Sequence, residues 1–172
     1  MDEEGDHFDD SYDDDIPWAD PSIRTDYEAA LGRLILAHNE VDLRVTQLIE
    51  RCLDRLDNPP PMRRLTHGML GERLRSLDLL KALPINLELD RVDLSKLHQL
   101  NNDRNVVAHG HFEQNPFDGD YVLIGRKKRI EDYPTERLDR ITADLQAASR
   151  QLSVLVDFYD PPDIPQPEPA AR

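Results

Sequence analysis

The sequence holds a single cysteine, Cys52, few aromatic residues and no long hydrophobic run. One thiol can form neither an intrachain disulfide nor a cysteine-rich zinc site, so a reducing compartment is the simpler interpretation. No apolar stretch approaches the roughly 18 residues of a membrane span, and the chain does not open with the basic-then-apolar pattern of a secretory signal. These absences predict a cytoplasmic protein that makes no membrane contact.

Basic residues are missing from residues 1–20, where carboxylates gather. The acidic residues there are Asp2, Glu3, Glu4, Asp6, Asp9, Asp10, Asp13, Asp14, Asp15 and Asp20, and they supply most of the net charge of −14. Residues 1–21 are too acidic and too poor in apolar residues to fold alone, so we expect an acidic disordered tail. This tail serves solubility or, through Phe8, Tyr12 and Trp18, covers a basic cleft as a nucleic-acid mimic. The rest of the chain is only mildly acidic, so the net charge does not exclude an anionic ligand for the folded part.

Proline is concentrated at the opposite end of the chain. Residues 160–172 contain Pro161, Pro162, Pro165, Pro167 and Pro169, which bar a helix and predict a Pro-rich disordered tail. Residues 22–159 remain as one domain, long enough to bury a core without disulfides or structural metals.

Apolar residues recur at the i, i+3, i+4, i+7 spacing of a buried helix face in four stretches of this domain. The first stretch spans about residues 23–56 and stops at the prolines that follow Asn58. The second spans 69–83 and ends before Pro84. Both therefore predict helices with one face in the core.

The third stretch begins at Asp90 or Asp93, either of which can cap the free N–H groups of a helix. It ends at Gly110, which offers a left-handed stop. The fourth opens at Thr135 and continues to the second tail. Before it, residues 111–130 include a turn signal and a β-prone run, and they predict a short β-hairpin or ordered loop. The expected fold is all-α, a four-to-five-helix up-down bundle with this insertion before its last helix.

Most familiar catalytic signatures are missing from the chain. It has no phosphate-binding glycine loop, no HExxH and no nucleophile elbow, and Gly68–Gly71 lacks the preceding strand that a nucleotide-binding loop needs. The best histidine cluster, His109 with His111, has only Glu113 nearby as a further metal ligand. The sequence therefore predicts neither a metal nor a cofactor.

One polar segment, residues 101–109, lies late in the third predicted helix. It contains Arg104-Asn105 and ends at His109, close to the expected C-terminus of the helix. On helical geometry Arg104 and His109 can converge on one pocket if the last turn loosens before Gly110.

The run Arg104-Asn105-Val106-Val107-Ala108-His109 resembles the R-polar-x3-H motif of HEPN (higher eukaryotes and prokaryotes nucleotide-binding) domains. The similarity extends to the layout, a helical bundle with the motif late in a central helix. It implies a HEPN-like domain and a homodimer in which the motifs of two subunits face each other. It further implies a metal-independent endoribonuclease or RNA-binding factor with a toxin, defence or stress role, and an antitoxin or other protein partner.

The resemblance also implies roles for individual residues. The 2′-hydroxyl of RNA is the nucleophile, His109 acts as general base or acid, Arg104 binds the phosphate oxygens, and Asn105 orients the histidine or the phosphate. Members often carry an acidic residue in the first helix that faces the motif, which makes Asp42 the expected partner of Arg104.

Further residues are candidates for the same cleft. His38 is one turn from Asp42 and is expected to line it, or else to be a hydrogen-bonded core residue. His111 follows the motif closely. The basic run Arg126, Lys127, Lys128 and Arg129 can grip an RNA backbone, although such runs are usually solvated surface.

A structural interpretation competes with this reading. Arg104 can cross-link helices through a carboxylate such as Asp42, and His109 can cap the last carbonyls of its helix. The chain would then be a catalytically silent helical module for dimerisation or protein interaction, with its two tails as contact segments.

Overall fold

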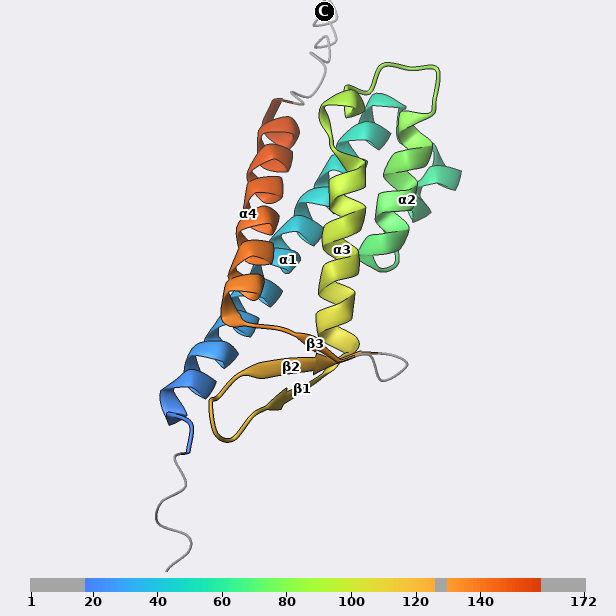
Figure 1. Cartoon of the computed structure of the whole chain (residues 1–172). Coiled ribbons are helices and arrows are strands. Elements are labelled where there is room, and N and C mark those ends of the chain that lie inside the picture. The colour runs from blue at the N-terminus through green and yellow to red at the C-terminus, as the bar shows by residue number, and fades with distance from the viewer. Residues whose placement is uncertain (1–17, 126–129, 159–172) are drawn as a thin grey trace, which may run out of the picture.

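The computed structural model describes residues 18–125 and 130–158, which form a helical bundle with a small sheet at one end (Figure 1). Mainly helical structure was predicted, and it is confirmed. Across the described residues, no helix combines the length and apolar character needed to cross a membrane. The basic run 126–129 lies outside the described residues, as do residues 1–17 and 159–172.

The longest element is α1 (Pro21–Arg55), which begins slightly before the predicted start. The Asp20 side chain caps it by accepting a hydrogen bond from the Ser22 backbone N–H at 2.8 Å. One face is buried over its whole length, as the apolar spacing predicted. It ends where Asp57 and Asn58 adopt positive φ angles of 57° and 45° ahead of the prolines.

The two shorter helices of the bundle begin at identifiable caps. Helix α2 (Leu70–Lys81) has a capping interaction in which the Met69 backbone N–H donates to Glu72 Oε2 at 2.9 Å. Helix α3 (Leu94–His109) begins at Asp93, whose side chain accepts from the Lys96 backbone N–H at 2.9 Å. Of the two predicted caps, Asp93 is therefore the one used.

The helices do not alternate up and down, and this part of the prediction is wrong. Tyr27 of α1 donates to the Tyr133 carbonyl just before α4 (Thr135–Phe158), and Arg33 pairs with Asp139 within α4. Contacts that advance together along both elements show that α1 and α4 run parallel (Figure 1). Helix α2 follows the same direction, and only α3 runs the opposite way.

Two connections produce this arrangement. After α1 the chain returns along the bundle through a 3₁₀ segment, η2 (Pro60–Thr66), so that α2 starts level with the middle of α1. A second 3₁₀ turn, η3 (Leu89–Arg91), precedes α3. The sheet then reverses the chain between α3 and α4, at the lower end of the bundle in Figure 1.

The sheet has three antiparallel strands, one more than the predicted hairpin. They are β1 (His111–Gln114), β2 (Tyr121–Ile124) and β3 (Ile130–Asp132), in spatial order β1-β2-β3. Gly119, with φ of 81°, forms the predicted turn between the first two. The ring of Tyr121 stacks on Tyr27 of α1 with centroids 3.7 Å apart, which holds the sheet against the bundle.

Gly110 ends α3, but not by the left-handed stop that we predicted. Its φ is −86° and its ψ is 163°, an extended conformation open to any residue. The requirement is space, because a Cβ at Gly110 would lie 2.1 Å from Leu123 Cδ1, and Leu123 is fully buried. Glycine therefore lets the end of α3 pass directly over strand β2.

Candidate functional site

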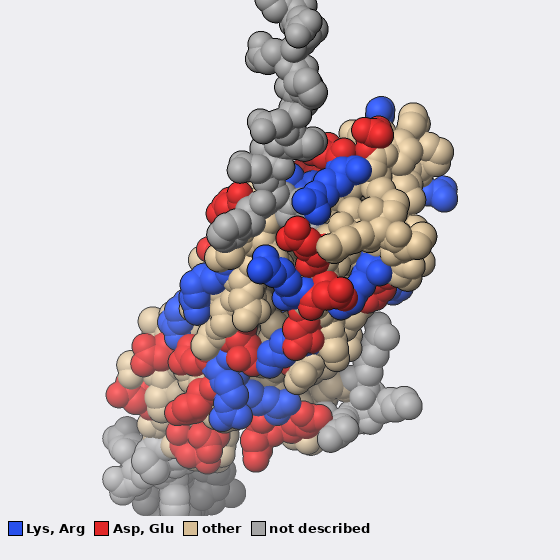
Figure 2. All heavy atoms as spheres, turned by 90° about the horizontal axis from the view of Figure 1, so that it is seen from above, with Lys and Arg blue, Asp and Glu red and all other residues tan. Residues whose placement is uncertain are grey.

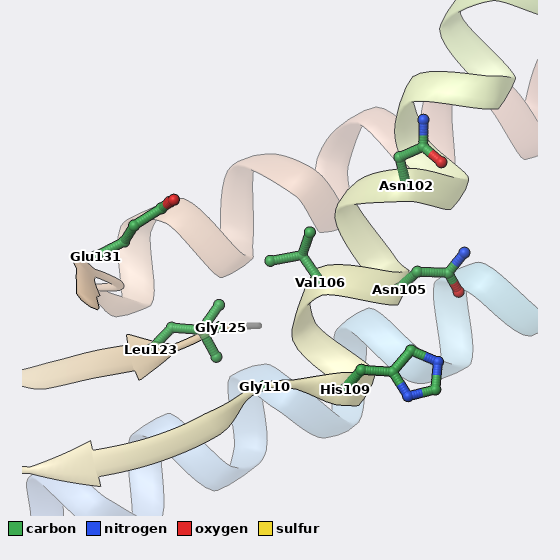
Figure 3. A pocket seen from close by; sticks show the side chains of 8 residues that line it. All are labelled: Asn102, Asn105, Val106, His109, Gly110, Leu123, Gly125 and Glu131. Carbon is green, nitrogen blue, oxygen red and sulfur yellow. The ribbon is translucent and has the colours of Figure 1, made fainter. Parts of the chain in front are cut away.

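The polar segment of α3 lies between two adjoining cavities. The first, of about 590 Å³, opens between α3 and the sheet and is here called the sheet-side cavity. Its lining residues are Asn102, Asn105, Val106, His109, Gly110, Leu123, Gly125 and Glu131 (Figure 3). Val106 and Leu123 supply its apolar side chains, and Asn102, Asn105, His109 and Glu131 supply its polar ones.

The second cavity, of about 710 Å³, lies among α1, α2 and α3 and is here called the helix-side cavity. It is lined by His38, Asn39 and Asp42 of α1, by residues 68–73 and Arg75 at the start of α2, and by Asn101, Asn102, Arg104 and Asn105 of α3. Donor groups from three helices thus open onto one space.

Arg104 and His109 do not share a cavity, contrary to the prediction. Arg104 lines the helix-side cavity and His109 the sheet-side one, because five residues of helix turn by about 140° and rise about 7.5 Å. Asn102 and Asn105 border both spaces and connect them. In Figure 3 the exposed imidazole of His109 points to the same side as the Asn105 amide, away from Leu123 and Glu131.

Arg104 is half-buried and has no ion pair within the described residues. Its one hydrogen bond runs from Nη1 to Asn105 Oδ1, at 3.4 Å, and its Nε is buried without a partner. The predicted pairing with Asp42 is wrong. Asp42 instead forms an ion pair with Arg73, which also donates to Thr46 Oγ1 at 2.8 Å. Arg73 lies next to Asp42 because α2 begins alongside the middle of α1.

His38 lines the helix-side cavity, and its side chain is buried, with 6% of the residue exposed. Neither ring nitrogen makes a hydrogen bond, so the alternative of a hydrogen-bonded core histidine does not hold. Burial lowers its pKa, and the nearby Arg104 guanidinium lowers it further. The Asn101 and Asn39 amides and the Asp42 carboxylate oppose this shift, but no amide meets the geometry of a hydrogen bond to the ring.

Two other sequence features fall outside the site. His111 is exposed on β1, opposite Ile124, and lines neither cavity. Asp103 is turned toward Arg137 and Lys96, and burial raises its pKa. The polar run of α3 therefore divides between the cavities and the packing against α4.

The sequence reading missed the contribution of α2. Arg73 and Arg75 line the helix-side cavity together with the Gly68–Gly71 segment, for which the sequence predicted no ligand. No local pattern places them there, because the return of the chain through η2 decides which part of α1 they face. Only the pair of glycines before a helix was a usable signal.

Charge and donor chemistry limit what the site can hold. In the described ranges, no three histidine, cysteine, aspartate or glutamate side chains are grouped to bind a metal ion. Basic and acidic side chains are interspersed over the face in Figure 2, so no large field of one sign covers it. Local donors, rather than the overall charge, therefore set the ligand preference of each cavity.

Comparisons with models of protein families, with curated proteins and with solved structures find nothing that matches this chain.

Proposed function

We propose that this chain is a HEPN-like domain that binds RNA and cleaves it without a metal ion, through Arg104, Asn105 and His109. The observation that carries the proposal is a guanidinium without a carboxylate partner in the described structure, open to a cavity. The Asn105 amide follows Arg104 in the chain, and the exposed imidazole of His109 lies about one helical turn after Asn105. A purely structural arginine would be expected to hold an ion pair at this depth.

The proposed reaction needs only these groups and the substrate. His109 removes the proton from the 2′-hydroxyl, whose oxygen attacks the adjacent phosphorus. The bond from phosphorus to the 5′-oxygen breaks, that oxygen takes up a proton from solvent, and a 2′,3′-cyclic phosphate remains. His109 then releases its proton to solvent, so the reaction balances. Arg104 donates to the phosphate oxygens while charge builds up on them, and Asn105 orients the phosphate between the two cavities.

The active unit in this proposal is a homodimer. Within one copy, Arg104 and His109 line different cavities, so a single phosphate does not contact both side chains. His109 is exposed at the end of α3 and is accessible to a second copy. Facing motifs would let Arg104 of one copy and His109 of the other act on one phosphodiester.

Cleavage of end-labelled RNA in excess EDTA tests the proposal. We expect the wild type to leave 2′,3′-cyclic phosphate ends, and a substrate with 2′-deoxyribose at the cleaved position to resist. His109→Ala and Arg104→Ala should each lower the rate by about 100-fold or more. His98→Ala and Arg33→Gln are the controls, because His98 is in hydrogen-bond contact with Asp78 and Arg33 forms an exposed ion pair with Asp139, both away from the cavities. Equal cleavage by all variants, or none by the wild type at any concentration, contradicts the proposal.

A second candidate, a helical association module, is favoured by a different observation. Leu36 and Leu43 are 67% and 54% exposed and lie seven residues apart on one face of α1. Val154 of α4 is 53% exposed, and α4 borders Leu43 through Arg150 and Ser153. Two turns of exposed leucine are typical of a helix-pairing surface. A stable dimer that binds no RNA would favour this candidate alone.

A further inference from the structure

Every buried side-chain nitrogen or oxygen that lacks a hydrogen bond, among the described residues, belongs to a residue of the helix-side cavity. These atoms are Nδ1 and Nε2 of His38, Nε of Arg73 and Nε of Arg104. A buried polar group without a partner costs about 1–3 kcal/mol, and native proteins contain few. Their collection around one space of about 710 Å³ points to a ligand that supplies the missing partners.

The unpartnered groups are mainly donors. The two arginine Nε atoms can only donate, and a neutral imidazole donates through one nitrogen and accepts through the other. Arg75, exposed at the edge of the cavity, adds a guanidinium with no ion pair in the described structure. The ligand must therefore carry several acceptor oxygens, and a hydroxyl on it would satisfy the accepting nitrogen of His38.

The charges in the cavity favour an anion. Three arginines face two carboxylates, and both carboxylates are already engaged. Asp42 is paired with Arg73, and Glu72 accepts the Met69 backbone N–H. Within the described residues Arg75 and Arg104 form no ion pair, and with His38 neutral the charged side chains of the cavity leave a net charge of +1.

The N-terminus of α2 opens onto the same space. Within the described residues the Leu70 and Gly71 N–H groups donate to no backbone carbonyl, whereas the Glu72 N–H donates to the Met69 carbonyl at 2.9 Å. The first turn also carries the positive end of the helix dipole. The backbone at Gly71 comes so close to α3 that a Cβ there would lie 3.2 Å from Asn101 Nδ2. Anions bind readily at such helix ends, and here the buried His38 ring supplies an independent unpartnered group.

We propose that the helix-side cavity binds a phosphate group through His38, Arg75, Arg104 and the N-terminus of α2. A tetrahedral phosphate presents acceptor oxygens in several directions, which matches donors that arrive from three helices. A planar carboxylate, with two oxygens, would leave some of these donors unpartnered.

Applied to RNA, the cavity takes the cleaved phosphate, which Arg104 contacts, an extension that depends on the proposed function. Asn102 and Asn105 join this cavity to the His109 side, and the two sides are about 7.5 Å apart along α3. An extended strand can then place successive phosphates in the two cavities. The phosphate site itself does not require cleavage.

The first experiment measures binding of inorganic phosphate to the full chain by calorimetry, at constant ionic strength with chloride as the reference anion. We expect saturable binding, with a shift of the His38 ring nitrogens in ¹⁵N NMR spectra. Arg75→Gln should weaken binding at least about tenfold, the cost of one charged hydrogen bond. Arg140→Gln is the matched control, since it removes the same charge from an exposed site on α4. Circular dichroism verifies that both variants fold.

The proposal is overturned if inorganic phosphate shows no saturable binding. It is also overturned if Arg75→Gln and Arg140→Gln weaken phosphate binding equally and the ¹⁵N signals of the His38 ring do not shift. A second arm distinguishes the source of the phosphate, using a non-cleavable 2′-deoxy-substituted oligonucleotide with and without a terminal phosphate. Displacement of inorganic phosphate by these oligonucleotides supports the RNA role, whereas binding without displacement assigns the site to a free phosphate. Binding with no RNA cleavage sinks the proposed function and leaves the phosphate site intact.

Discussion

Replacing Gly110 with alanine tests the contact that positions the end of α3 on the sheet. The new Cβ would lie 2.1 Å from Leu123 Cδ1, 2.9 Å from Leu123 Cγ and 3.0 Å from the Val106 carbonyl oxygen. Alanine tolerates the φ of −86°, so the backbone itself opposes nothing. The effect is therefore steric, and it acts on a leucine that is only 1% exposed.

Forcing one methyl group into this packed site should lower the free energy of unfolding by about 1–3 kcal/mol, the usual cost of overpacking. Gly32→Ala is the control. A Cβ at Gly32, in the middle of α1, meets nothing within 4 Å. That substitution should raise the free energy of unfolding by about 0.5–1 kcal/mol, because alanine is the better helix former. The two glycine-to-alanine changes thus have opposite expected signs.

Urea unfolding followed by circular dichroism measures both effects, and a double-mutant cycle isolates the clash. Leu123→Ala alone should cost about 2–5 kcal/mol, because it leaves a cavity in the core. With both substitutions, the added methyl group occupies part of that cavity. The double variant should then be more stable than the sum of the single effects predicts, by about 1 kcal/mol or more. Strict additivity, or a Gly110→Ala variant as stable as the wild type, would refute the packing argument.

Three further predictions concern the cavity and the bundle surface. Burial and the Arg104 guanidinium lower the pKa of His38, while the Asp42 carboxylate opposes this shift and Arg73 lies close by. The unfolded chain therefore binds a proton at His38 at a higher pH than the folded chain does. The stability contributed by neutral His38 is full above its ordinary pKa of about 6.5 and is lost as the pH falls below that value. His38→Gln should therefore make the decrease in Tm between about pH 7 and pH 5 smaller. Parallel curves of Tm against pH for the wild type and the variant would contradict this. Arg73→Gln leaves Asp42, with a side chain 32% exposed, without its partner and should destabilise the fold by about 1–3 kcal/mol in urea. Arg24→Gln, which breaks the exposed pair with Glu28, should change stability little, and equal effects would argue against a role for burial. Substituting Leu36 and Leu43 with glutamate should abolish self-association in analytical ultracentrifugation if α1 pairs between copies, whereas the same change at Leu79, 65% exposed on α2, should not.

Local patterns were sufficient to locate the helices. The apolar spacing of α1 and α4, an aspartate cap at Asp90 or Asp93 and the start of α4 after Pro134 all depend on interactions within a few residues. The structure confirms the helices and uses Asp93 as the cap. The turn at Gly119 belongs to the same group, because a positive φ favours glycine wherever it occurs. Such features can be read from the sequence because the chain nearby supplies both partners.

Local sequence patterns could not predict the partners of the charged side chains. Asp42 binds Arg73 rather than Arg104 because α2 starts beside the middle of α1, and that position depends on the path of η2. Gly110 is needed for a residue thirteen positions away along the chain, Leu123, and not for its own φ. The sequence by itself determined which segments are helical and which residues of α3 are polar. The tertiary structure decided which elements enclose the cavities that Arg104 and His109 line, since the direction in which helices pack is set by contacts between residues far apart in the chain.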